Sequence, residues 1–292
     1  MKDFIYECPA TIEEAVAAMQ VDGARALAGG TDLIPQLREG RRQAGRIVDL
    51  KRIPELMHVS GLGDGGIVLG AAANMTSVAR HAAVADSYPA IAQSARLVGS
   101  LQVQNRASLG GNICNAAPSA DAVPALICHQ ARARITGTAG HREEVLESLI
   151  RGPGKTSLLP GELLLSIVVP PTLPRSAAKY LRFTPRREMD IAIAGAAAWL
   201  RIDAMGVIAE ARIVLASVGP GPIRAASAEH RMLGERPTPG LFEAVGRLAA
   251  NDARPISDTR ASADYRRSLV AVLTARALVD CCAAVQTELE RS

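Results

Sequence analysis

Aromatic residues are scarce in this chain: its 292 residues include three Phe, four Tyr and one Trp. Proteins that bind single-stranded nucleic acid stack bases on aromatic side chains and follow the phosphates with basic residues. The arginine pairs Arg41-Arg42 and Arg186-Arg187 have no aromatic residues interleaved with them, and the net charge of +4 is mild for this length. The composition therefore argues against a nucleic-acid partner.

The residues that usually form metal sites and disulfides are also sparse. The five cysteines are Cys8, Cys114, Cys128, Cys281 and Cys282. None belongs to a C-x-x-C pair, their number is odd, and the five histidines are scattered without ligand spacing. The sequence thus predicts no metal site and no disulfide framework. It also offers no catalytic triad or carboxylate pair, so we nominate no catalytic residue.

Long apolar runs are missing too. No uninterrupted apolar stretch is long enough to cross a bilayer, and the N-terminus, with Lys2, Asp3 and Glu7, lacks the apolar core of a signal peptide. We therefore expect no transmembrane segment and a cytoplasmic location. Nearly half of the residues (48%) are apolar, which is enough for a sizeable core, and the length predicts two or three lobes.

Periodicity and turn residues predict a mixture of helices and strands. A helix is expected over residues 11–20 with Thr11 as its N-cap. Further helices are predicted over residues 33–38, 75–85, 89–98, 123–129, 239–251 and 261–285. Strands are predicted over residues 24–28, 46–50, 68–72, 163–170, 179–184, 191–203 and 209–218.

Two short glycine turns are the most informative segments. Residues 26–38 read ALAGGTDLIPQLR, and residues 105–127 read NRASLGGNICNAAPSADAVPALI. A glycine pair allows positive φ and close approach of a ligand, and successive N–H groups in such a turn form a nest for anions. Asn112, Asn115 and Ser119 could complete the polar edges of a ligand, and Asp121 suits a sugar hydroxyl. Either turn alone is more typical of an ordinary tight turn.

Together the two segments resemble the two FAD-binding loops of the flavoprotein (medium) subunit of molybdenum hydroxylases, such as xanthine dehydrogenase and carbon monoxide dehydrogenase. No G-x-G-x-x-G fingerprint of a Rossmann fold follows a strand. The resemblance covers essentially the whole chain and implies an α+β fold. It implies a two-subdomain FAD-binding fold of the vanillyl-alcohol-oxidase (PCMH) type, residues 1–52 and 53–172. A C-terminal flavoprotein domain, residues 173–292, follows with a three-stranded antiparallel sheet and helices.

The same resemblance implies which residues contact FAD. The expected cofactor-binding residues are Ala26, Leu27, Ala28, Gly29, Gly30, Thr31, Asp32, Leu33, Ala72, Ala107, Ser108, Gly110, Gly111, Asn112, Asn115, Ser119, Asp121, Leu164 and Arg182. The family places Ala71 or Ala72 at the adenine end and Leu163 and Leu164 beside the flavin, although any core strand would contain such leucines. Arg182 is expected to contact the flavin or its phosphates; the alternative is a structural Arg–Asp pair or a solvated charge. Small-residue packing is the favoured role of Cys114.

The resemblance implies an electron-transfer subunit. Its FAD would take electrons from the [2Fe-2S] clusters of a small partner subunit and pass them to an external acceptor. A large molybdopterin subunit would oxidise the substrate, in a heterotrimer that is commonly doubled. A free-standing FAD oxidoreductase and a non-redox assembly subunit are the alternatives. The sequence specifies neither substrate nor acceptor, although GGTD in place of the GGHS of carbon monoxide dehydrogenase argues against carbon monoxide.

Overall fold

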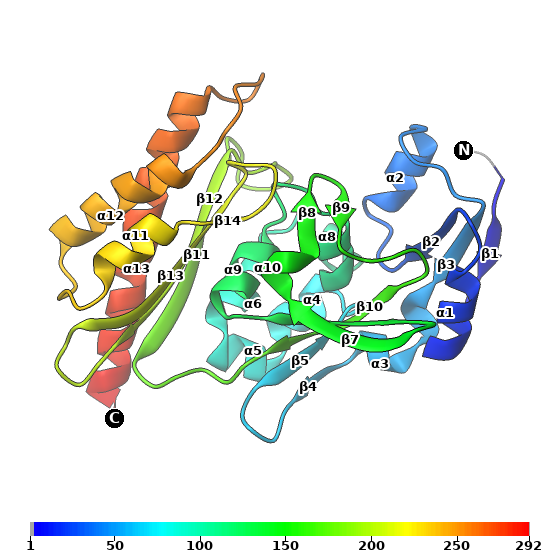
Figure 1. Cartoon of the computed structure of the whole chain (residues 1–292), viewed down its shortest axis with the longest axis horizontal. Coiled ribbons are helices and arrows are strands. Elements are labelled where there is room, and N and C mark those ends of the chain that lie inside the picture. Colours follow the sequence, from blue (N-terminus) through cyan, green and yellow to red (C-terminus); the bar gives the residue numbers. More distant parts are fainter. Residues whose placement is uncertain (1–2, 292) are drawn as a thin grey trace.

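The computed structural model of the chain describes residues 3–291. Three parts follow one another along its longest axis, from the N-terminal part, in blue, to the C-terminal part, in yellow-green to red (Figure 1). Each part contains its own sheet, and helices lie against these sheets. The mixed helix and strand content confirms the predicted α+β fold.

The N-terminal part is built on a parallel sheet with the strand order β1-β3-β2. Its elements are β1 (Ile5–Glu7), α1 (Ile12–Met19), β2 (Ala24–Leu27), α2 (Leu33–Arg38) and β3 (Arg46–Asp49). The helix α1 begins as predicted, because the Thr11 side chain accepts a hydrogen bond from the N–H of Glu14. Asp32 is the N-cap residue of α2, but its side chain makes no capping hydrogen bond. A 3-10 helix, η1 (Leu50–Arg52), and α3 (Pro54–Met57) lead out of this part.

The central part contains a five-stranded antiparallel sheet with the order β4-β5-β10-β6-β7. Its strands are β4 (Val59–Gly61), β5 (Ile67–Gly70), β6 (Arg132–Gly137), β7 (Gly140–Val145) and β10 (Leu163–Val169), and a small hairpin is formed by β8 (Ile150–Gly152) and β9 (Lys155–Thr156). Its helices are α4 (Met75–Arg80), α5 (Ala82–Ser87), α6 (Pro89–Arg96), α7 (Leu101–Gln104), α8 (Leu109–Cys114), α9 (Ala122–Cys128) and α10 (Leu146–Leu149). The single helix predicted over residues 75–85 is two helices, because His81 adopts an extended conformation (φ −66°, ψ 124°) between them.

The C-terminal part is an antiparallel sheet with helices on its outer face (Figure 1). Its elements are β11 (Ser176–Phe183), β12 (Ala194–Ile202), β13 (Ile208–Ala216), β14 (Ile223–Arg224), α11 (Ala226–Met232), α12 (Pro239–Asp252) and α13 (Ala263–Arg291). The prediction of three strands omitted β14, whose two residues are too few to show an alternating pattern. β12 joins two cores: Ala196 and Ala198 pack towards the outer helices, while Ala197 and Trp199 pack towards the central part.

The helix α13 passes the length and composition criteria for a membrane span over residues Ala263–Glu290, which the sequence prediction did not anticipate. On one side of this helix, Val270, Ala277 and Leu278 are fully buried in the core formed with the sheet and α12. About 39% of the apolar stretch of this helix is buried in this way, so α13 packs on the core along one side.

Candidate functional site

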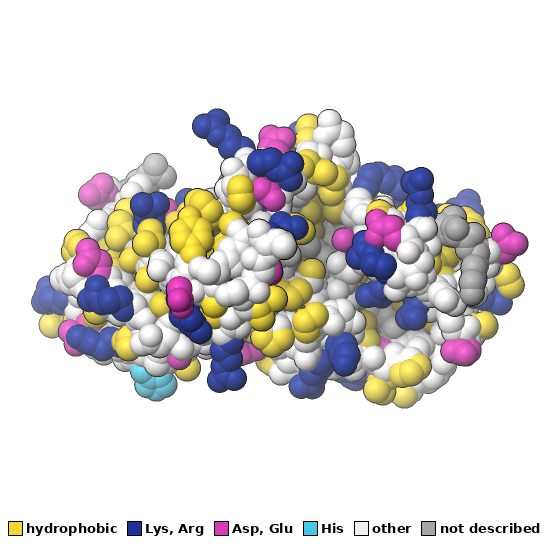
Figure 2. All heavy atoms as spheres, turned by 90° about the horizontal axis from the view of Figure 1, so that it is seen from above, with side chains coloured by type: hydrophobic (Ala, Val, Ile, Leu, Met, Phe, Trp, Pro, Cys, Tyr) yellow, Lys and Arg dark blue, Asp and Glu magenta, His cyan; other side chains and the backbone are white. Residues whose placement is uncertain are grey.

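A large cavity lies between the N-terminal and central parts, where the surface is visibly hollowed (Figure 2). Its volume of about 1100 Å³ lies slightly above the usual range for small-molecule sites, which leaves room for a large cofactor. Both glycine loops line it, and so does every predicted cofactor-binding residue except Arg182. Residues that are far apart in the sequence are therefore brought to one site.

The two glycine loops touch each other through their backbones. A Cβ atom on Gly29 would lie 2.0 Å from the carbonyl oxygen of Arg106 and 2.8 Å from the Cα of Ala107. Glycine is required there because only a residue without Cβ allows two backbones to approach so closely. Gly30 has a different requirement, since its φ of +74° lies in the left-handed region. The Gly29-Gly30 pair thus joins the loops and turns the chain into α2.

The first loop presents unpaired main-chain donors. Within residues 3–291, no protein acceptor receives a hydrogen bond from the N–H groups of Gly29, Gly30, Thr31, Asp32 or Leu33. The first donor of this segment that is satisfied is Ile34, whose N–H bonds to the carbonyl oxygen of Gly30 at 3.1 Å. Free N–H groups beside a cavity favour an anionic ligand such as a pyrophosphate.

The second loop differs from the prediction. Gly110 and Gly111 lie within α8 and do not have positive φ. The N–H groups of Leu109 and Gly110 donate to the carbonyl oxygens of Ala73 (3.1 Å) and Ala71 (2.8 Å), and the N–H of Gly111 donates to Ser108 Oγ at 3.0 Å. The expected N–H nest is therefore wrong for this loop. Gly110 is needed for close packing instead, because its Cβ would lie 2.6 Å from the carbonyl oxygen of Ala71.

Asn112 provides the clearest sign that the cavity takes a polar ligand. Its side-chain Oδ1 is buried and has no hydrogen-bond partner among the described residues, and Asn112 lines the cavity. A buried acceptor without a donor is costly, so a ligand hydroxyl or N–H beside it would be stabilising. Asn115, in contrast, already accepts a hydrogen bond from Gln36 at 3.1 Å. These features fit FAD, which carries a pyrophosphate and several hydroxyl groups.

Asp121 lines the cavity, but its carboxylate is engaged with two side chains of β11. Tyr180 Oη donates to Asp121 Oδ1 at 2.8 Å, and the Arg182 guanidinium forms a hydrogen-bonded ion pair with Oδ2. All three side chains are buried. Burial raises the pKa of Asp121 to about 6, against the opposing effect of Arg182 and of the hydrogen bond from Tyr180. The structure places Arg182 in a buried Arg–Asp pair and not on the cavity wall.

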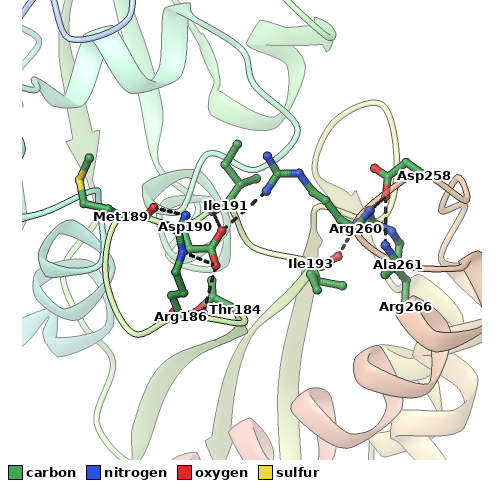
Figure 3. Close-up of polar contacts among 10 residues, drawn as sticks. All are labelled: Thr184, Arg186, Met189, Asp190, Ile191, Ile193, Asp258, Arg260, Ala261 and Arg266. Carbon is green, nitrogen blue, oxygen red and sulfur yellow. Dashed lines mark hydrogen bonds and ion pairs between the residues drawn. The ribbon is translucent and has the colours of Figure 1, made fainter.

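One wall of the cavity was missed by the sequence analysis. Met189, Asp190 and Ile191, from the loop between β11 and β12, line the cavity, and the N–H of Met189 donates to the carbonyl oxygen of Gly99 at 3.2 Å. Asp190 organises this loop by accepting from the N–H groups of Arg186 (3.0 Å) and Ile191 (2.9 Å), and it faces Arg260 of the segment before α13 (Figure 3). These contacts outweigh desolvation and lower the pKa of Asp190.

Tyr180 was also missed, although a signal was present. It precedes Arg182 by two positions on one strand, so both side chains lie on the same face of the sheet. The resemblance also pointed to the turn that follows Arg182, with Arg186, Arg187 and Asp190, but residues 189–191 were not among the expected cofactor-binding residues, because the loop reaches the cavity only through tertiary packing.

Acidic residues outnumber basic residues on the cavity wall. The charged lining residues are Asp22, Asp32, Asp121, Glu162, Asp190, Arg25 and Arg42. Burial raises the pKa of Asp32, which lies in the first glycine loop. An anionic ligand in this cavity would therefore be bound more by main-chain N–H groups than by cationic side chains.

Cys114 should react slowly with iodoacetamide, although it lines the cavity. Burial raises the pKa of its thiol to about 12, so the thiolate fraction at pH 8 is about one in ten thousand. Both Cys8 and Cys114 are partly exposed, so mass spectrometry after timed alkylation should show Cys8 modified first because of the raised pKa of Cys114. Rapid alkylation of Cys114 near pH 8 would contradict a purely packing role for this residue.

Comparison with known proteins identifies the family. Residues 2–172 match the family model described as the FAD binding domain in molybdopterin dehydrogenase, and residues 179–281 match the CO dehydrogenase flavoprotein C-terminal domain. The xanthine dehydrogenase FAD-binding subunit of Escherichia coli O157:H7 is 30% identical over 294 residues, covering 99% of this chain and 100% of that relative.

Solved structures agree with these matches. Carbon monoxide dehydrogenase from Hydrogenophaga pseudoflava has a chain with a TM-score of 0.92 and 29% identity, covering 97% of this chain and 98% of that one. Quinoline 2-oxidoreductase from Pseudomonas putida 86 has a chain with a TM-score of 0.91 and 27% identity, covering 98% and 99% respectively. This chain therefore belongs to the family of FAD-binding medium subunits of molybdenum hydroxylases, and it is an oxidoreductase subunit whose cofactor is FAD.

Proposed function

We propose that this chain carries electrons from the [2Fe-2S] clusters of a small partner subunit to an external acceptor. When bound, FAD supplies the redox chemistry and links one-electron to two-electron carriers. The observation that carries the proposal is the cavity of about 1100 Å³ between two glycine loops, in a chain whose full length matches flavoprotein subunits. The chain's own residues then bind the cofactor, orient it and shield it from water.

Each wall of the cavity has a separate task in this proposal. The free N–H groups of residues 29–33 would hold the pyrophosphate. Asn112 Oδ1 would accept a hydrogen bond from the cofactor. The Asp121 carboxylate, held in one orientation by Tyr180 and Arg182, would face the cofactor from the cavity wall. Leu164 and the loop of residues 189–191 would limit the access of water from their sides.

The proposal includes the partners and the setting. The solved carbon monoxide dehydrogenase that this chain resembles is a form that lacks the Mo-pyranopterin moiety of its molybdenum cofactor. We infer a large molybdopterin subunit and a small [2Fe-2S] subunit, assembled as a doubled heterotrimer in the cytoplasm. We also retain the division of the chain at residues 52 and 172 into two FAD-binding subdomains and a C-terminal domain.

Co-purification with partners tests this function. The complex isolated through a tag on this chain should show a flavin absorption band together with iron and molybdenum, and its flavin should be reduced when the partner's substrate is added. Flavin without metals or partners would favour a free-standing FAD oxidoreductase. A complex that remains colourless after reconstitution with FAD would favour a non-redox assembly subunit.

A further inference from the structure

The first glycine loop is contacted by a charged pair in which Asp49 is buried and Lys51 is half-buried. Lys51 lies in η1, immediately after β3, and Asp49 ends β3 with an exposed fraction of 5%. Lys51 Nζ donates to the carbonyl oxygen of Ala28 at 3.0 Å, and to Asp49 Oδ1 and Oδ2 at 2.7 and 2.8 Å. Neither Lys51 nor Asp49 lines the cavity.

The ammonium group of Lys51 is thus shared between the Ala28 carbonyl oxygen and the Asp49 carboxylate, and its charge is balanced by Asp49. Tyr6 Oη donates a further hydrogen bond to Asp49 Oδ2. Burial alone would raise the pKa of Asp49, but the hydrogen bonds from Lys51 and Tyr6 outweigh burial and lower that pKa, so the pair stays charged.

The carbonyl group that Lys51 binds belongs to the peptide unit preceding Gly29. In a trans peptide the C=O and the N–H point in opposite directions, and no cis bond occurs in the described chain. When the Ala28 oxygen points at Lys51, the Gly29 N–H must point away from it, and this N–H has no protein acceptor within residues 3–291. Glycine on one side of this peptide makes its rotation easy, so the orientation needs an external anchor.

We propose that Lys51 is a positioning residue for the FAD pyrophosphate, acting through the Ala28–Gly29 peptide. Lys51 holds the Ala28 carbonyl oxygen away from the pyrophosphate. The Gly29 N–H then points to the opposite side and joins the N–H groups of residues 30–33 as a donor to the pyrophosphate. The wall of the cavity is rich in acidic side chains. If the Ala28–Gly29 peptide were rotated, its carbonyl oxygen would face the pyrophosphate and add further negative partial charge there. The inference rests on the proposed role of the first loop in holding FAD.

The test is ligand binding to the full-length chain after removal of its flavin. In Lys51→Met, the dissociation constants for FAD and for ADP should each rise about tenfold or more, while the constant for riboflavin, which has no pyrophosphate, should stay within about twofold. Lys51→Arg keeps a cation that can reach both acceptors and should restore most of the FAD affinity. Lys179→Met is the matched control, because Lys179 Nζ pairs with Asp280 Oδ2 at 3.8 Å and neither residue lines the cavity.

A purely structural role predicts a different pattern. It would lower the unfolding temperature and weaken the binding of all three ligands together, and that result would overturn the proposal. Dissociation constants for FAD and ADP within twofold of those of the parent would also overturn it. If Lys51→Met does not fold, Lys51→Gln provides the second variant; it removes the cation but keeps a polar side chain, and it should weaken FAD and ADP selectively. Failure of the parent chain to bind FAD would instead overturn the proposed function itself.

Discussion

Replacing Gly29 with alanine should abolish stable FAD binding and destabilise the folded chain. The added Cβ would lie 2.0 Å from the Arg106 oxygen, 2.6 Å from the Arg106 carbonyl carbon and 2.8 Å from the Ala107 Cα. All three are backbone atoms, so no side-chain rotation relieves the clash, and the two glycine loops must separate. Overpacking of this kind costs about 1–3 kcal/mol or more. We expect purified Gly29→Ala to retain less than about a tenth of the parent's flavin, and its unfolding temperature to fall by about 2–4 °C for each kcal/mol lost.

Gly240→Ala is the matched control for this substitution. Gly240 lies in the first turn of α12, and a Cβ there would meet no atom within 4 Å. Alanine is the better helix former, so this variant should bind flavin normally and unfold at the same or a slightly higher temperature. Flavin content and stability in Gly29→Ala that match those of Gly240→Ala would show that the contact between the loops is not needed.

Replacing Arg182 with methionine should destabilise the chain even in the absence of flavin. Arg182 and Asp121 form a buried ion pair between β11 and the start of α9. Removing one partner of a buried pair leaves an uncompensated charge, which costs about 3–5 kcal/mol. Denaturant unfolding of the flavin-free chain measures this loss. If Arg182 acted only on the flavin, the flavin-free variant would be as stable as the parent.

The destabilisation by Arg182→Met should depend on pH in a defined direction. The pKa of Asp121 in the folded parent is about 6, above its value of 3.8 in the unfolded chain, so ionisation of Asp121 opposes folding as the pH rises through this window. Without Arg182 the pKa of Asp121 rises further, because the main positive charge that favours its carboxylate is gone. Ionisation of Asp121 then costs more stability as the pH rises. The difference in stability between variant and parent should therefore be larger at pH 8 than at pH 5.

A double variant separates the charge from the packing. Arg182→Met combined with Asp121→Asn removes both charges, and the amide oxygen still accepts the hydrogen bond from Tyr180. The double variant should recover at least half of the stability lost in Arg182→Met at pH 8. A double variant less stable than either single variant would contradict the assignment of the loss to an unpaired carboxylate.

The comparison of sequence and structure separates local from non-local information. Thr11 as an N-cap, the three long strands of the C-terminal sheet and the helix that begins at Pro239 were predicted, because capping residues and periodicity act within a few positions. The helix α8 was not predicted, because a glycine pair disfavours a helix locally. The packing of Gly110 on Ala71 overrides that preference.

The sequence by itself determined the family, the α+β fold and the two glycine loops that line the cavity. Only the tertiary structure decided how the loops are used. It joins Gly29 to Arg106, directs the N–H groups of the second loop to Ala71 and Ala73, and pairs Arg182 with Asp121. The physical reason is that turn chemistry and periodicity are properties of neighbouring residues. The availability of a donor or a charge for a ligand depends instead on which distant segment packs against it.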